Sequence, residues 1–151
     1  MLKGGYTIMA TRSAVNSRWY RLERIYGQQS KKLGKSSSTI SVILNISYQP
    51  SGCTQSELMA RTLLPKQTIN SIVKSLRKEG LVELQTIPTD RRIKNIFLTS
   101  QGKKFVKQEL EPASLAEQES LESLTPEEQR QFLNLFDQYL DALEKHFQRL
   151  N

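Results

Sequence analysis

The sequence has few of the residues that build catalytic or metal sites. Its 151 residues include one cysteine, Cys53, and one histidine, His146. A single cysteine cannot form an internal disulfide, which fits a reducing compartment. There is no Cys/His cluster at zinc-ligand spacing and no glycine-rich phosphate loop, and nothing near His146 resembles a catalytic triad. The sequence therefore predicts neither an enzyme nor a bound metal or other cofactor.

Long hydrophobic runs are also missing. No stretch approaches the roughly 18–20 apolar residues of a membrane span. Residues 1–10 include Lys3 but no sustained apolar segment, so we expect no signal peptide. Apolar residues make up 37% and charged residues 25% of the chain, which favours a compact protein over a disordered one. We therefore expect a cytoplasmic protein with one domain and helical extensions.

Acidic residues are scarce in most of the chain. Residues 1–110 contain 19 Lys or Arg and 6 Asp or Glu, a balance of +13, whereas residues 111–151 contain 3 and 9, a balance of −6. A basic body with an acidic end indicates that the body meets a polyanion and that the end does not. The acidic end shows no metal-binding pattern, because Glu117, Glu119 and Glu122 resemble a solvated helix face.

Apolar residues recur at helical spacing over much of the chain. Thr54 with Glu57, and Thr125 with Glu128, have the pattern of a capping box at a helix start. Pro112 either kinks a helix or begins the next segment. These patterns predict helices over 11–33, around 40–46, from 54 to about 62, over 65–79, from 99 to 110, and from 125 towards the end of the chain.

The clearest amphipathic helix is the one over 65–79. Pro65 suits its first turn, and Gly80 suits the position just past its end. Its apolar stripe consists of Ile69, Ile72, Val73 and Leu76. Its other face is basic and rich in hydrogen-bonding groups, with Lys66, Gln67, Thr68, Asn70, Ser71, Lys74 and Arg77. A helix fits the DNA major groove, where Gln and Asn can pair with adenine and Lys can reach guanine or phosphate.

After residue 80 the pattern changes to that of strands. Residues 81–87 and 94–99 are β-branched and apolar, and a polar turn with Asp90, Arg91 and Arg92 separates them. This arrangement predicts an antiparallel hairpin with a basic tip. Arginine suits the strongly negative minor groove, and Asp90 can hold one arginine by a charge-assisted hydrogen bond. Helix and hairpin together predict binding to double-stranded DNA.

Residues 54–102 contain a series of recognisable motifs. They are Thr54-Gln55-Ser56-Glu57-Leu58, Lys66-Gln67-Thr68-Ile69-Asn70, Leu76-x-x-x-Gly80-Leu81-Val82, and Asp90-Arg91-Arg92 followed by Leu98-Thr99-x-x-Gly102. With these motifs, residues 54–102 resemble the winged-helix region of MarR-family transcriptional regulators, and the last motif is the most specific. The flanking helices match in position and pattern rather than in residues.

The resemblance implies a mostly α fold with a small β-hairpin wing, a winged helix-turn-helix between N- and C-terminal dimerisation helices. The expected segments are 1–35 and 101–151 for dimerisation and 36–100 for DNA binding. It implies a regulator, in this family usually a repressor, that binds a pseudo-palindromic operator as a homodimer. The expected DNA contacts are Lys66, Gln67, Thr68, Asn70, Ser71 and Lys74 in the recognition helix and Asp90, Arg91, Arg92 and Lys94 in the wing.

The dimer also follows from the residues themselves, because the terminal helices carry apolar stripes that a small central unit cannot cover. The alternative is a monomer whose two ends pack on each other. The expected dimer contacts are Val15, Phe132, Phe136, Tyr139, Leu143 and Phe147.

Two further hypotheses concern the control of DNA binding. Family members commonly release DNA when a small aromatic compound binds between the dimer helices and the winged domain, and the aromatic residues near that junction are Trp19, Tyr20, Tyr26 and Tyr48. Alternatively Cys53, just before a helix start, has a lowered pKa and senses oxidants.

A different class of function is also open at this point. The chain can be a winged-helix module that binds protein rather than DNA, although this leaves the basic helix face and the paired arginines unexplained.

Overall fold

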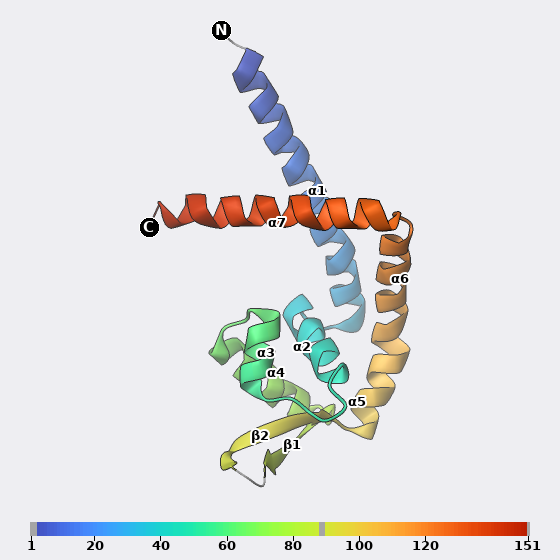
Figure 1. Cartoon of the computed structure of the whole chain (residues 1–151). Helices are drawn as coiled ribbons and strands as arrows, with labels where there is room; N and C mark the ends of the chain where they lie inside the picture. The colour runs from blue at the N-terminus through green and yellow to red at the C-terminus, as the bar shows by residue number, and fades with distance from the viewer. Residues whose placement is uncertain (1–2, 88–89, 151) are drawn as a thin grey trace. The chain divides into compact units, whose positions relative to one another are not determined.

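The computed structural model describes the backbone of residues 3–87 and 90–150 and the side chains of residues 11–86 and 94–150. It divides into two compact units, Met1–Glu111 and Pro112–Asn151. In chain order the elements are α1 (Lys3–Leu33), α2 (Ser37–Ser47), α3 (Gln55–Thr62), α4 (Lys66–Lys78), β1 (Val82–Ile87), β2 (Asp90–Leu98), α5 (Ser100–Phe105), the π-helical turn η1 (Val106–Leu110), α6 (Glu111–Glu122) and α7 (Pro126–Gln148) (Figure 1).

The predicted fold class is confirmed, because the chain is mostly helical with one two-stranded antiparallel hairpin. Two boundaries differ from the expectation. Helix α1 begins at Lys3 rather than at residue 11, since a nucleated helix extends at low cost beyond its apolar stripe. Strand β2 begins at Asp90 rather than at Lys94. Backbone pairing therefore extends into the polar segment that the sequence assigned to the turn.

The core lies in the first unit, where α2, α3 and α4 pack on the base of the hairpin (Figure 1). Its buried apolar residues include Ile43, Leu58, Leu76 and Ile96, each with no exposed surface. Cys53 joins this core, and its N–H and carbonyl exchange hydrogen bonds of 3.1 and 2.8 Å with Ile96. The core therefore fixes α4 and the hairpin relative to each other.

The hairpin pairs β1 with β2 in a regular register down to Thr86, which faces Lys94. Val82 pairs with Leu98, and the register shifts between Thr86 and Ile87. The side chains of Asp90, Arg91 and Arg92, which the sequence predicts at the wing tip, lie outside the described residues.

The second unit consists of α6 and α7, which meet at a corner (Figure 1). The predicted capping box starts α7, with the Thr125 N–H donating to Glu128 Oε2 at 2.8 Å. Gln129 closes the corner, since its Nε2 donates to the carbonyls of Leu121 and Leu124, both at 3.0 Å. Pro112 is the second residue of α6, directly after η1, and α5, η1 and α6 follow one another without a break. It therefore lies within a continuous helical run, at the point where the π-helical turn ends.

No helix within the described residues has both the length and the apolar character that a bilayer crossing requires.

Candidate nucleic-acid interface

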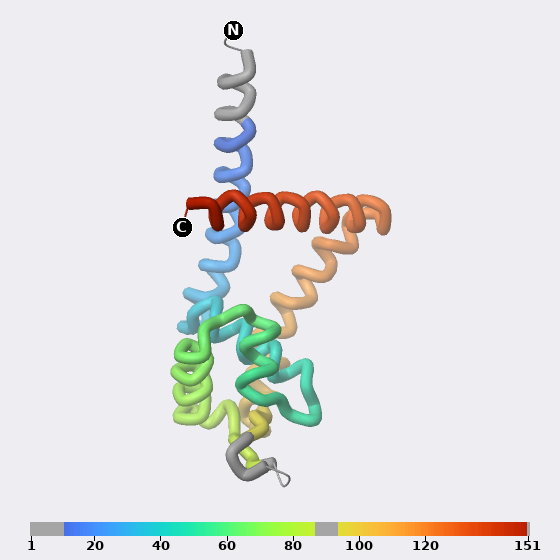
Figure 2. Tube along the Cα trace, turned by 60° about the vertical axis from the view of Figure 1, so that its left-hand side comes forward, coloured from blue at the N-terminus to red at the C-terminus, as the bar shows by residue number. Residues whose placement is uncertain are grey.

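Helix α4 is held by its apolar side and presents its polar side to solvent. The predicted stripe of Ile69, Ile72, Val73 and Leu76 is buried, and α3 and α4 lie side by side in Figure 1 and Figure 2. Burying one face of a helix leaves the opposite face free for a ligand. The sequence segregates the two faces cleanly, so core packing alone orients the polar surface outward.

The structure places the six predicted recognition residues on this outward surface. Thr68 is half-buried. The other five are exposed, namely Lys66, Gln67, Asn70, Ser71 and Lys74. No side chain of the six makes a hydrogen bond or ion pair with another described residue. Their donors and acceptors are therefore available to an external partner.

The polar surface extends further along α4 than the predicted set. A shallow groove of about 570 Å³ is lined by Ser71, Lys74, Ser75, Arg77 and Lys78. Ser75 and Lys78 were not predicted, although both follow earlier members of the face at a spacing of four residues. The helix therefore presents positive charge along its whole length.

A second groove, of about 420 Å³, lies between α3, α4 and the hairpin. Its lining residues are Thr54, Gln55, Ser56, Met59, Lys66, Leu84 and Lys94. The structure thus brings together Lys66 of α4 and Lys94 of β2, which the sequence assigned to separate DNA-binding elements. Gln55 and Ser56 also line this groove and are additional candidates for DNA contacts.

The N-terminus of α3 in this groove is closed by its own side chains. Thr54 N–H donates to Glu57 Oε2 at 2.7 Å, and Glu57 N–H donates to the Thr54 hydroxyl at 3.2 Å. The Thr54 hydroxyl also donates to Glu57 Oε2, at 3.0 Å. The hydrogen bonds that the Thr54 N–H and hydroxyl donate to this carboxylate hold the pKa of Glu57 below its ordinary value. Because Glu57 is therefore ionised at neutral pH, the positive charge of the groove comes from Lys66 and Lys94 rather than from the helix end.

The turn between α3 and α4 is tight. Leu63 caps α3 in the left-handed region, with φ of 56°, and its N–H donates to the Met59 carbonyl at 2.9 Å. Pro65 stands at the N-cap of α4, one position earlier than the expected first turn. This turn fixes the direction in which α4 starts relative to α3.

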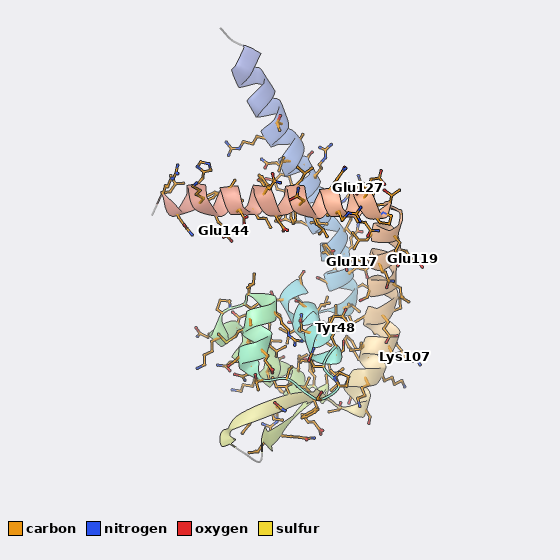
Figure 3. All side chains as sticks on the ribbon, viewed as in Figure 1. Tyr48, Lys107, Glu117, Glu119, Glu127 and Glu144 are labelled. Atoms are coloured by element: carbon orange, nitrogen blue, oxygen red, sulfur yellow. The ribbon has the colours of Figure 1, made fainter. Side chains whose placement is uncertain are left out.

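The four aromatic residues predicted for an effector are all exposed, and none of them lines either groove. Trp19 and Tyr26 are seven residues apart and share one face of α1, whereas Tyr20 is turned about 100° from Trp19. Tyr48 caps the end of α2 (Figure 3). A compound that contacts Trp19, Tyr20 and Tyr26 together must therefore reach more than one face of α1.

The predicted dimer residues lie on unburied helix faces. Val15 is half-buried on α1, and α7 has no buried residue. On α7 the apolar stripe is exposed throughout, with relative exposures from 37% to 57%: Phe132, Phe136, Tyr139, Leu143 and Phe147. The rings of Phe132 and Phe136 stack at 5.9 Å. The acidic residues Glu119, Glu127 and Glu144 are spread along α6 and α7 (Figure 3).

The expectation for Cys53 is wrong in one respect. The thiol is 1% exposed, and burial raises its pKa to about 11, with the Glu57 carboxylate adding to the rise. The effect of desolvation on the pKa of Cys53 therefore outweighs the effect of the nearby helix N-terminus, which alone would lower it. Among the described residues, no group of His, Cys, Asp and Glu is arranged to hold a metal ion.

The comparisons with known proteins agree with this geometry. Residues 33–93 match the sequence model of the MarR family, and a comparison with curated protein sequences found no match. A MarR family regulator from Neisseria meningitidis superposes with a TM-score of 0.74 and 19% identity, covering 92% of this chain and 97% of that one.

Two further solved structures have the same fold. MepR of S. aureus in its complex with DNA has a TM-score of 0.70 and 19% identity, covering 87% of this chain and 96% of that one. BpsR of Bordetella bronchiseptica, whose DNA binding is regulated by 6-hydroxynicotinic acid, has a TM-score of 0.68 and 19% identity, covering 85% and 91%. The resemblance found in the sequence is confirmed: residues 33–93 match the MarR-family model, and the chain has the fold of these regulators.

Proposed function

We propose that the protein is a sequence-specific regulator of transcription that binds double-stranded DNA. The observation that carries this proposal is the outward face of α4, which is basic and mostly exposed, and whose six predicted residues make no side-chain hydrogen bond or ion pair with another described residue. A charged surface that serves only solubility ordinarily mixes both signs. This face has no acid before Glu79, as expected of a surface that meets phosphate.

The roles within the interface follow from chemistry. Gln67 and Asn70 carry amides, which pair with adenine in the major groove. Lys66, Lys74 and Lys94 carry point charges that suit phosphates, which position the protein without reading sequence. The wing residues Arg91 and Arg92 are proposed for the minor groove on sequence grounds, with Asp90 holding one of them. Substituting either arginine by alanine is expected to cost about 1–3 kcal/mol of binding.

The active form in this proposal is a homodimer. An exposed apolar stripe on a long helix needs a partner surface, and the stripes of α1 and α7 supply self-complementary faces. A two-fold dimer presents two copies of α4 to half-sites about one helical turn apart. The operator is then an inverted repeat, and repression follows if it overlaps a promoter.

A small aromatic effector is the proposed control. Its support is the exposed aromatic set on α1 and at the end of α2, together with the regulation of BpsR by an aromatic acid. Such a compound releases DNA only if it binds the DNA-incompetent conformation more tightly.

The test is selection of random duplexes by the purified protein, followed by affinity measurements against salt. An inverted repeat and a salt slope of several released counterions are the expected result. The variants Asn70→Ala and Lys74→Met are compared with Lys107→Met, which removes an exposed charge from η1 (Figure 3). If no duplex is enriched and all variants behave alike, the protein is a module that binds protein instead.

A further inference from the structure

A single lysine joins the end of α1 to the end of the recognition helix. Lys35 lies between α1 and α2, and its Nζ is 2.5 Å from Glu79 Oε2. Glu79 is the C-cap of α4. The Lys35 side chain is 12% exposed and the Glu79 side chain is 41% exposed. Lys35 is thus more sheltered from solvent than the lysine of a fully exposed surface ion pair, which would contribute little.

Other groups hold the two partners in place. Lys35 Nζ lies 5.5 Å from the centre of the Phe105 ring on α5, within the range of a cation–π contact. Glu79 also accepts a hydrogen bond of 3.1 Å from the Ser75 hydroxyl through its other oxygen. The contacts of Lys35 and Glu79 therefore connect the α1–α2 joint to the last turn of α4 and to α5.

The joint that carries Lys35 is itself well defined. Lys35 N–H donates to the Ser30 carbonyl at 3.1 Å and Gly34 N–H donates to the Lys31 carbonyl at 3.3 Å, with Gly34 at φ of 59°. This is the Schellman pattern of helix termination. The next residue, Ser36, caps α2, and the hydroxyls of Ser30 and Ser37 are 2.9 Å apart. The direction of α1 is thus transmitted to Lys35 through a short, hydrogen-bonded turn.

The contact with Lys35 stabilises the negative charge on Glu79. A carboxylate at a helix C-terminus is opposed by the helix dipole, so Glu79 is unfavourable there without a cation. The Lys35 ammonium compensates it and, with the Ser75 hydroxyl, holds the pKa of Glu79 below its ordinary value. Removing Lys35 leaves Glu79 unpaired at the end of α4, and removing Glu79 leaves a mostly buried ammonium without its ion-pair partner.

We propose that Lys35 is a positioning residue that sets the direction of α4 relative to α1 through its contact with Glu79, and thereby fixes the spacing of the DNA half-sites. The inference rests on the proposed function, because α1 must belong to the dimer interface and α4 must read DNA. In a dimer held at α1, any rotation of α4 about the contact between Lys35 and Glu79 changes the separation of the two α4 helices. The ion pair between Lys35 and Glu79, at the end of α4, is therefore suited to restrict the distance between the two α4 helices.

The experiment measures affinity for a series of duplexes whose half-sites are moved together or apart by one and two base pairs. The full-length wild type is compared with Lys35→Met, Lys35→Arg, and the exchanged pair Lys35→Glu with Glu79→Lys. Lys32→Met is the matched control, because Lys32 is an exposed lysine in the last turn of α1. Thermal unfolding of each variant establishes that it is folded at the temperature of the binding assay.

Lys35→Met is expected to lower the preference for the best spacing over its neighbours about threefold to tenfold, whereas Lys35→Arg and the exchanged pair restore it in part. Loss of stability alone would weaken binding to every spacing equally. An unchanged ranking of spacings in a folded Lys35→Met overturns the inference and leaves the proposed function intact. If the wild type itself binds no duplex, the proposed function fails and the inference is overturned with it.

A second measurement does not require DNA. Spin labels attached at Lys78→Cys report the distance between the two α4 helices of a dimer, since Lys78 is exposed and Cys53 is buried. Lys35→Met is expected to broaden the distance distribution and Lys32→Met to leave it unchanged. Equal distributions in both variants would contradict a positioning role for Lys35.

Discussion

Gly102 lies directly against the carbonyl oxygen of Leu81, so that a Cβ atom on Gly102 would come within 2.0 Å of that oxygen. Thr99 forms the other half of the contact. Its N–H donates to the Leu81 carbonyl at 3.1 Å, its hydroxyl donates to the Gly80 carbonyl at 2.6 Å, and it accepts from the Gly102 N–H at 3.0 Å. The Thr99-x-x-Gly102 motif thus fastens α5 to the base of the hairpin.

Gly102→Ala should destabilise the protein, although alanine ordinarily favours a helix by about 1 kcal/mol over glycine. The added methyl group meets main-chain atoms that cannot rotate away, and overpacking of this kind costs about 1–3 kcal/mol or more. Chemical unfolding measures the change in the free energy of unfolding.

Gly27→Ala on α1 is the matched control, because nothing lies within 4 Å of its added Cβ. It should leave stability unchanged or raise it. A Gly102→Ala variant as stable as Gly27→Ala would show that α5 can shift away from Leu81.

The parts of the fold that the sequence predicted well are those set by local chemistry. The stripe from Ile69 to Leu76, both capping boxes and the turn at Gly80 depend on residues a few positions apart, and each is found as expected. The start of α1 at Lys3 could not be predicted in this way, because Gly4 and Gly5 disfavour a helix.

The interface was harder to predict, because it depends on contacts between distant residues. The sequence placed Lys66 and Lys94 in two separate elements, and only the packing of the hairpin on α3 and α4 brings both into one groove. Cys53 shows the same limit. Its position before Thr54 predicted a lowered pKa, whereas its pairing with Ile96, 43 positions along the chain, buries the thiol and raises it.

Residues that read bases and residues that contact phosphate should differ in their salt dependence. Lys94→Met is expected to weaken binding to all duplexes alike and to lower the slope of log affinity against log salt by about 1. Asn70→Ala is expected to cost about 1–3 kcal/mol on the preferred operator and to relax its specificity, with little change in slope. Fluorescence anisotropy over a range of salt concentrations distinguishes the two. A sequence-dependent loss in Lys94→Met would place that lysine against a base instead.

The stacked pair Phe132 and Phe136 offers the sharpest test of the dimer. Phe136→Glu places a charge within the apolar stripe of α7 and should weaken association by about 2 kcal/mol or more. Sedimentation should show a shift towards monomer, and affinity for an inverted repeat should fall because two half-sites no longer act together. Asn134→Glu, exposed on another side of α7, should change neither. If Phe136→Glu remains a dimer, the α7 stripe is not the interface.

Cys53 should be inert to oxidants and alkylating agents in the folded protein. Its pKa of about 11, raised from 9.0 by burial, keeps the thiol protonated at neutral pH, and only the thiolate reacts rapidly. A thiol-specific chromogenic reagent at pH 8 should therefore label Cys53 only after unfolding. Ser120→Cys on the exposed face of α6, made together with Cys53→Ala, should react at once.

The raised pKa also has a consequence for stability. Because the folded state holds the proton more tightly than the unfolded chain, this contribution to the free energy of unfolding is complete below pH 9 and is lost as the pH rises from about 9 towards 11. Cys53→Ala should remove that part of the alkaline loss of stability.

Peroxide should leave DNA binding unchanged in the wild type and in Cys53→Ala, since regulation by oxidants requires a thiolate that this core does not allow. Release of DNA by peroxide in the wild type, abolished in Cys53→Ala, would instead show that the α3 end of the core opens often enough to expose the thiol.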